Sequence, residues 1–241
     1  MKAGIAFALL ILSATPTRVA ADLPTVVRSS PSFWGLNVNA RQKEISLTFN
    51  QPMRPRFWDW FGRDVLSPLS NLNTTVTPDH TTFGVDVQLE PAKVYVCGLN
   101  ERGISGVGFQ TEKGISLPPT FLVFQTAGNI APQDAPPHVI RSIPQHGATG
   151  LDSATVRSIS ITFDKAMNPK RHGLHVFENN NPVDVSRAQV AYSPDGLTFT
   201  LAYAFKPATQ YRFELNDIHD IGFSGTNRVP LWPVQISFAT R

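Results

Sequence analysis

The sequence predicts an all-β protein with two tandem immunoglobulin-like β-sandwich domains after an N-terminal signal peptide. Three observations predict this: an apolar leader, an internal repeat through the rest of the 241 residues, and period-two hydrophobic alternation in each copy. Hydrophobic residues are 41% of the chain and charged residues 16%, which is enough apolar material for a folded core. Twenty prolines and 16 glycines interrupt the chain too often for long helices.

The first 21 residues are expected to be the signal peptide. Lys2 gives a positive start, residues 3–14 form an apolar run, and small residues precede Asp22 at the expected cleavage point. The run is too short for a permanent membrane span and no later segment is longer. We therefore expect an exported protein without a transmembrane segment, located in the periplasm or secreted to the cell surface.

The charge balance of the expected mature chain is close to neutral. Removal of Lys2 and Arg18 with the leader leaves 19 basic against 18 acidic residues. Binding to nucleic acid or to an anionic membrane needs a concentrated basic surface, so neither is expected as the main partner. The single cysteine, Cys97, excludes an internal disulfide, and the strand parity predicts it to be a buried, unreactive thiol.

The internal repeat divides the mature chain into residues 22–128 and 138–241, with a proline-rich linker at 129–137. The sequence VVRSSP at 26–31 recurs as VIRSIP at 139–144. Further collinear matches follow at offsets that drift slightly and then return, which is the behaviour of loops between fixed strands. The prolines of the linker favour an extended, semi-rigid spacer.

Each copy is expected to be a sandwich of about seven short strands. Residues 44–50, 83–89 and 158–164 alternate between apolar and polar side chains, which indicates one buried and one solvated face. Turn-forming residues separate these segments at the spacing of an immunoglobulin-like sandwich. Further strands are expected near residues 26–30, 56–61, 94–99 and 120–126, with counterparts in the second copy.

Three segments of the second copy carry a family resemblance: ISITFDKAM at 159–167, FKPATQYRFEL at 205–215 and ISFAT at 236–240. Together with their counterparts in the first copy, they resemble the bacterial Ig-like domain first noted in S-layer proteins, the SbsA Ig-like family. The resemblance implies a sandwich that serves as a spacer and adhesion module, and it transfers no catalytic residue. The first copy departs from the pattern in its aromatic stretch FWDWF at 57–61.

No catalytic residue, cofactor-binding residue or metal site is predicted, because the phosphate-loop, nucleophile-elbow and zinc-protease motifs are missing from the sequence. His172 and His175 fall on opposite faces of a strand, so surface histidines are the simpler interpretation than a metal site with His219. A calcium ion at the turn from Asp217 to Asp220 is a further alternative. We expect a protein that is not an enzyme and uses no cofactor.

A comparison of the copies predicts an apolar outer face on the first one. The two strands expected at residues 94–99 and 120–126 point apolar side chains outward. At the matching positions, the second copy has the polar residues Gln210, Arg212, Gln235 and Ser237. The neighbouring strand adds either the two tryptophans of the aromatic stretch or its two flanking phenylalanines. Such a face usually marks a contact surface. The candidate contact face consists of Trp58, Trp60, Val94, Val96, Phe121 and Val123.

Three occupants of this face remain open: the chain's own residues 62–76 or second domain, a protein partner or second copy, and a glycan stacked on Trp58 and Trp60. The function expected first is surface contact, meaning adhesion, assembly or presentation of a partner, at the cell envelope or outside the cell. The alternative is a carbohydrate-binding or enzyme-accessory protein that uses the aromatic platform.

Overall fold

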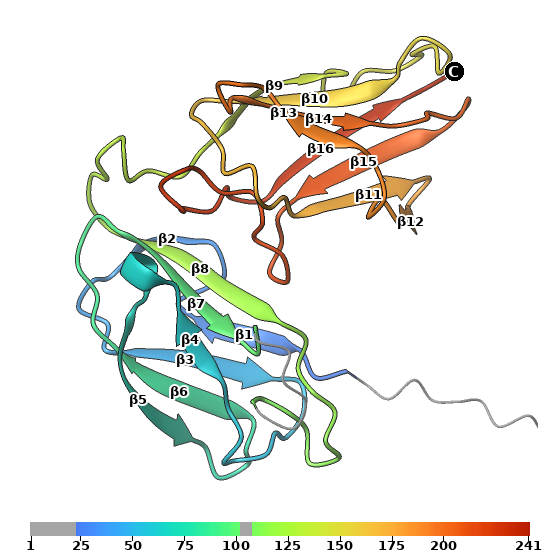
Figure 1. Cartoon of the computed structure of the whole chain (residues 1–241). Coiled ribbons are helices and arrows are strands. Elements are labelled where there is room, and N and C mark those ends of the chain that lie inside the picture. Colours follow the sequence, from blue (N-terminus) through green and yellow to red (C-terminus); the bar gives the residue numbers. More distant parts are fainter. Residues whose placement is uncertain (1–22, 102–107) are drawn as a thin grey trace, which may run out of the picture.

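The computed structural model describes residues 23–101 and 108–241, so the expected signal peptide lies outside the described residues. The described chain folds into four four-stranded sheets and one short 3-10 turn, η1 (Asp64–Leu66). Two sheets come from the first half of the chain and two from the second half, which gives two sandwiches (Figure 1). Within the described ranges, no helix is long and apolar enough to cross a membrane.

The first sandwich packs two sheets, with strand orders β1-β3-β6-β5 and β2-β8-β7-β4. All of its strand pairs are antiparallel except β2 with β8, which run parallel. The strands are β1 (Val26–Ser30), β2 (Gly35–Val38), β3 (Glu44–Phe49), β4 (Trp60–Gly62), β5 (Leu69–Val76), β6 (Thr82–Val87), β7 (Val94–Leu99) and β8 (Thr120–Thr126).

The second sandwich repeats this arrangement with strand orders β13-β14-β10-β9 and β12-β11-β15-β16. Leu151 makes a parallel bridge to Thr240, which corresponds to the pairing of β2 with β8 in the first sandwich. The strands are β9 (Val139–Ile143), β10 (Ser158–Phe163), β11 (Leu174–Glu178), β12 (Asn181–Val183), β13 (Val190–Tyr192), β14 (Thr198–Ala202), β15 (Gln210–Leu215) and β16 (Val234–Ala239).

Period-two burial holds the sheets of each sandwich together. On β3, Ile45, Leu47 and Phe49 are buried while the residues between them are partly exposed, and β10 repeats the pattern. The inward side chains of both sheets meet in one core per sandwich. This confirms the all-β, immunoglobulin-like class that the alternation predicts.

A tyrosine holds the same corner in both sandwiches. The Tyr95 hydroxyl accepts a hydrogen bond from the Glu90 amide at 2.7 Å, and the Tyr211 hydroxyl accepts one from the Lys206 amide at 2.5 Å. This is the tyrosine corner of immunoglobulin-like folds, which here fixes the turns before β7 and β15.

A buried asparagine holds the long loop before the last strand in each sandwich. The Asn216 side chain donates to the carbonyls of Phe223 and Leu231, each at 2.8 Å, and accepts from the Phe223 amide at 2.9 Å. Asn100 makes the matching three bonds with Phe109 and Leu117. Because these bonds satisfy backbone groups that water cannot reach, they fix the path of both loops.

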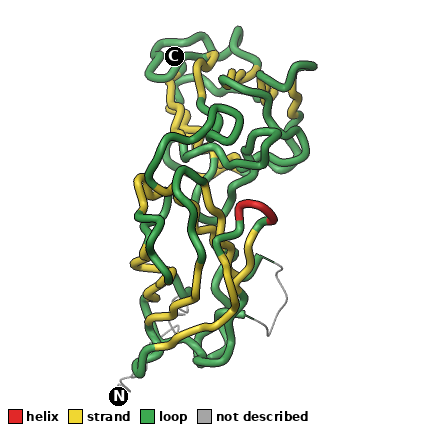
Figure 2. Tube along the Cα trace, turned by 90° about the vertical axis from the view of Figure 1, so that its left-hand side faces the viewer, coloured by secondary structure: helices red, strands yellow, loops and turns green. Residues whose placement is uncertain are grey.

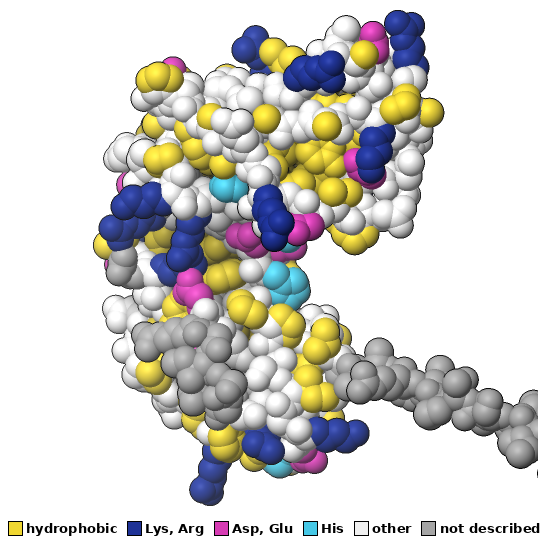
Figure 3. Space-filling view, turned by 45° about the vertical axis from the view of Figure 1, so that its right-hand side comes forward, with side chains coloured by type: hydrophobic (Ala, Val, Ile, Leu, Met, Phe, Trp, Pro, Cys, Tyr) yellow, Lys and Arg dark blue, Asp and Glu magenta, His cyan; other side chains and the backbone are white. Residues whose placement is uncertain are grey.

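The segment between the sandwiches is bonded to the second one. Its residues 132–134 form a turn, where the proline content predicts an extended spacer. The Lys165 ammonium donates to the Pro132 and Ala135 carbonyls at 2.8 and 2.7 Å, and the Asn227 amide donates to the Gln133 carbonyl at 2.8 Å. The two sandwiches lie one above the other (Figure 2) and meet at a waist in the space-filling view (Figure 3).

Candidate contact surfaces

The outer face of β7 and β8 is covered by other parts of the same chain. Val96 and Val123 are 0% exposed and Phe121 is 6% exposed. They form an apolar cluster with Leu66 of η1 and with Ile221 and Val229 from the loop between β15 and β16. That loop reaches from the second sandwich toward β8 in Figure 1. The chain's own second sandwich and η1 therefore occupy the face whose occupant the sequence left open.

Polar contacts fasten the same seam. The Phe121 amide donates to the Ile218 carbonyl at 2.7 Å, so the backbones of the two sandwiches are hydrogen-bonded. The Trp232 indole donates to the Trp34 carbonyl at 3.1 Å, and the two indole rings meet edge to face at 5.6 Å. The seam thus combines an apolar centre with directional bonds, which is the composition of a specific interface.

The third strand of this face, β4, contributes Phe61. Its ring lies directly over Gly98 of β7, since a Cβ on that glycine would come within 1.9 Å of the Phe61 ring. The same ring meets Phe121 edge to face at 6.4 Å. Because Gly98 has no side chain, the Phe61 ring can lie directly on the backbone of β7. The second sandwich has Glu214 at the matching position of β15.

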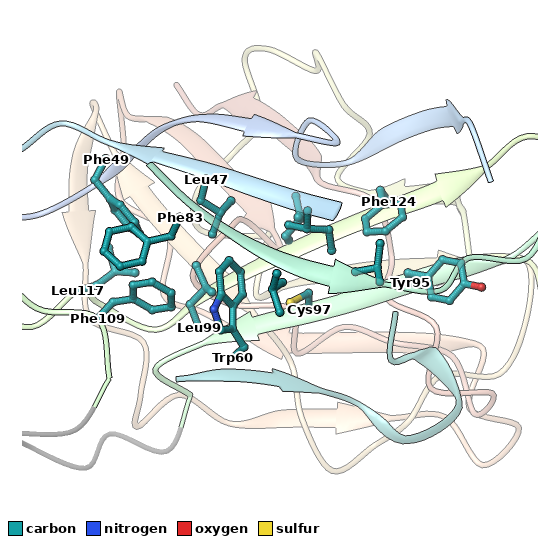
Figure 4. Close-up of a cluster of buried hydrophobic side chains, with 14 of the residues drawn as sticks. Leu47, Phe49, Trp60, Phe83, Tyr95, Cys97, Leu99, Phe109, Leu117 and Phe124 are labelled. Atoms are coloured by element: carbon teal, nitrogen blue, oxygen red, sulfur yellow. The ribbon is translucent and has the colours of Figure 1, made fainter. Parts of the chain in front are cut away.

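Trp60 lies in the core of the first sandwich, which corrects its place in the candidate contact face. It is 4% exposed and meets Phe109 edge to face at 5.1 Å, near Leu99 and Cys97 (Figure 4). Trp58 is half-buried and packs against the same core. The strand parity that puts Phe61 outside puts Trp60 inside. A buried indole offers no ring face to a sugar, so Trp60 cannot belong to an exposed stacking platform.

Cys97 is fully buried among core side chains, as its parity predicts. Burial without a compensating charge raises the pKa of the thiol from 9.0 to about 12. A thiol with this pKa stays protonated at neutral pH and is a poor nucleophile.

The histidines and aspartates considered as metal ligands are dispersed. His175 Nε2 lies 3.3 Å from an Asp217 carboxylate oxygen, while His172 packs against the Phe199 ring. His219 lies in the seam, with Nδ1 2.8 Å from the Pro119 carbonyl. In the described ranges, no three His, Cys, Asp or Glu side chains gather in a way that could hold a metal ion.

A second candidate surface is a groove of about 850 Å³ between β9 and the first half of β16. Both strands end their sheets, and within the described chain no strand pairs with the outer edge of β9. The second half of β16 is hydrogen-bonded along its outer edge to residues 147–151. Ile140 and Ile143 of β9 are 64% and 56% exposed, and Trp232 and Ile236 also line the groove. The sequence predicts no groove here, although Ile140 and Ile143, two isoleucines in the first strand of the second copy, are the residues that could have indicated it.

The groove continues toward the first sandwich. A neighbouring hollow of about 680 Å³ shares His138 and Trp232 with it and reaches Ile130 and Leu36. Because Trp232 also packs on Trp34, the groove runs directly into the seam between the sandwiches. A segment bound in the groove would thus lie against both sandwiches.

Comparison with known proteins points to the same fold. Residues 133–240 match the family described as bacterial Ig-like domain. No curated protein matches the chain. Among solved structures, the titin I-band fragment I67–I69 has a TM-score of 0.29 at 10% identity, and the alignment covers 90% of this chain and 65% of the fragment. The chimeric titin Z1Z2-Z1Z2 tandem has a TM-score of 0.33 at 8% identity, covering 90% of this chain and 98% of that one.

These structural scores are low, so the fold assignment depends on the strand order, the tyrosine corners and the family match. The match covers the whole second sandwich, β9 to β16. The first sandwich repeats the strand order of the second, with the same parallel pairing at its edge. The chain is an all-β protein built on the immunoglobulin-like sandwich.

Proposed function

We propose that this is a non-enzymatic, exported Ig-like protein that acts by surface contact with another protein at the cell envelope or outside the cell. The apolar leader of the sequence supports export. The family match supports a contact role, because modules of this type serve binding and spacing. With the outer face of β7 and β8 covered, the contact surface that we propose is the groove beside β9.

One observation carries this proposal: the outer edge of β9, which has no neighbouring strand within the described chain, borders an apolar groove. A strand without a neighbour presents backbone donors and acceptors that an incoming extended segment can pair with. Ile140 and Ile143 supply apolar surface in the groove, and every second side chain of an extended segment would face that surface, because side chains alternate along a strand. We therefore propose an extended segment of a partner protein, apolar at every second residue, as the occupant.

The position of the groove adds a second reason. It runs into the seam at Trp232, so a bound segment would extend an interface that already joins the two sandwiches. Arg141, His138 and His146 also line the groove and supply polar groups beside its apolar floor. An apolar centre with polar neighbours is typical of protein-binding surfaces.

The test is a selection from a library of random displayed peptides, followed by measurement of the affinity of selected peptides for the full chain. We expect peptides with apolar residues at alternate positions. Ile140→Lys should weaken them about tenfold or more, since it places a charge where apolar surface is buried. The control is Val27→Lys, because Val27 is the matching residue of the first sandwich and is 62% exposed. Equal loss in both variants, or no selected peptide, would contradict the proposal.

A further inference from the structure

Resting on the proposed function, we propose that the segment bound in the groove closes the open side of the second sandwich. It pairs with the first half of β16 as well as with β9, and it carries an acidic side chain toward Arg141. The groove lies between edge strands of two different sheets. It is lined by β9 on one side and by Val234, Gln235 and Ile236 of β16 on the other.

The backbone of Gln235 faces the groove. In an antiparallel pair, the amide and carbonyl of every second residue point to the same edge of a strand. Ser237 and Ala239 bond along the outer edge of β16 to residues 147–151. Gln235 continues this series, so its amide and carbonyl point outward too. Within the described chain, no backbone group from outside the sheet bonds to either of them.

The matching position of the first sandwich is already occupied. Phe121 stands there in place of Gln235, and its amide donates to the Ile218 carbonyl of the second sandwich at 2.7 Å. The same strand edge therefore receives a segment of a neighbouring sandwich in one copy and is open in the other. The contact between the two sandwiches shows how a partner segment can reach this edge.

The spacing of sheets and strands allows one segment to bond to both edges. Facing sheets lie about 10 Å apart and paired strands about 4.8 Å apart. A strand seated midway between β9 and the first half of β16 would thus lie at pairing distance from each. Because both of its own edges would then be used, an extended strand fits this position better than a helix, which keeps its backbone bonds to itself.

Arg141 sets the charge of the segment. It is exposed, and it forms no ion pair with any described residue. No aspartate or glutamate is among the described residues that line the groove. The His138 ring already lies 3.2 Å from an Asp164 carboxylate oxygen. The His146 ring already accepts a hydrogen bond from the Ser237 amide at 3.1 Å. The guanidinium therefore remains for the segment, and its best partner is a carboxylate.

The same charge argues against a second copy of the chain as the occupant. Two copies that paired through β9 would bring two Arg141 side chains into one contact, and like charges on neighbouring strands repel one another. We therefore assign the groove to a different protein, whose bound segment alternates apolar and acidic residues.

The experiment is isothermal titration of the full chain with two capped synthetic peptides, one alternating valine with glutamate and the other alternating valine with lysine. We expect the glutamate peptide to bind about tenfold or more tightly, because it gains a charge-assisted hydrogen bond to Arg141 while the lysine peptide is repelled. Arg141→Glu should reverse this order. The matched control is Arg28→Glu, since Arg28 is the exposed arginine at the same place in the first sandwich. It should leave both dissociation constants within about twofold.

A proline tests the edge of β16. Gln235→Pro removes the outward amide but no bond within the sheet, which is where edge strands tolerate proline. It should weaken the glutamate peptide about tenfold, whereas Gln235→Ala keeps the amide and should stay within about twofold. Thermal unfolding shows whether the proline variant is folded. Independently of any variant, the bound peptide should slow hydrogen exchange of the Gln235 amide in the unmodified chain about tenfold or more.

The outcomes separate this proposal from the proposed function. Equal binding of the two peptides would overturn the acidic partner and leave the groove as a general site for extended segments. Unchanged hydrogen exchange at Gln235 in the presence of bound peptide would overturn the pairing with β16. If neither peptide binds, the proposed function of the groove is contradicted as well.

Discussion

At the scale of single residues, the two sandwiches use the same side chains to hold equivalent turns and loops. Tyr95 and Tyr211 hold equivalent corners, and Asn100 and Asn216 hold equivalent loops. Cys97 shows the opposite case, because the second copy has Phe213 at that position and both side chains are fully buried. The position thus requires an apolar side chain, and the thiol serves there as a small hydrophobe.

The raised pKa of Cys97 predicts that its thiol is silent in the folded chain. At pH 8, a pKa of about 12 leaves on the order of a thousandfold less thiolate than an ordinary cysteine has. Labelling with iodoacetamide should therefore be negligible in the native protein and complete in the denatured one. Since this is the single cysteine, the denatured chain serves as the control. Stoichiometric labelling of the native protein within minutes would contradict the buried position.

The same pKa sets a direction for stability against pH. The folded state favours the neutral thiol, so its contribution is fully present below the ordinary pKa of 9.0. As pH rises from there toward about 12, the unfolded chain ionises first and this contribution is lost.

At the scale of elements, the decisive feature is the apolar outer face of β7 and β8. Its residues alternate as the sequence predicts, but both sets of side chains on these strands are buried, one in the core and one in the seam. On β15, the matching outward residues are polar, and Arg212 lies 3.8 Å from the Phe177 ring centre. The same pair of strands therefore has an outer face buried in the seam in the first copy and a polar outer face in the second copy.

Replacement of Val96 and Phe121 by their counterparts from the second copy tests this feature. The double variant Val96→Arg and Phe121→Gln should lower the free energy of unfolding by roughly 3 kcal/mol or more, because it buries polar groups in an apolar seam. Urea denaturation measures the change. Val27→Arg, on an exposed position of the same sandwich, should stay within about 0.5 kcal/mol of the unmodified chain. Equal stability of all three proteins would show that the face is not covered.

The sequence predicted the strands and the unusual face because both follow from local alternation. The sequence did not show what covers the outer face of β7 and β8, since Ile221 and Val229 reach that face from about a hundred residues further along the chain. It also left the parity of the aromatic stretch open, because β4 has only three residues and offers too short a run to read. The groove beside β9 depends on which strands end the sheets, and residue patterns do not state the strand order.

At the scale of the whole molecule, the seam joins two repeated sandwiches into one body. Apolar packing, the hydrogen bond from Phe121 to Ile218, the paired indoles of Trp34 and Trp232, and the bonded linker all act across or beside the same junction. Separate contacts that fix one arrangement restrict rotation much more than a single flexible linker would. The proposed groove depends on this fixed arrangement, since it borders the seam.

The most direct test of this joined arrangement is the distance distribution between two spin labels, one on each sandwich. Leu72→Cys and Ser186→Cys place labels at exposed positions, while the buried Cys97 should remain unlabelled. Pulsed electron spin resonance should give one narrow distribution, which Val96→Arg with Phe121→Gln should broaden. A broad distribution in the protein with an intact seam would contradict the account.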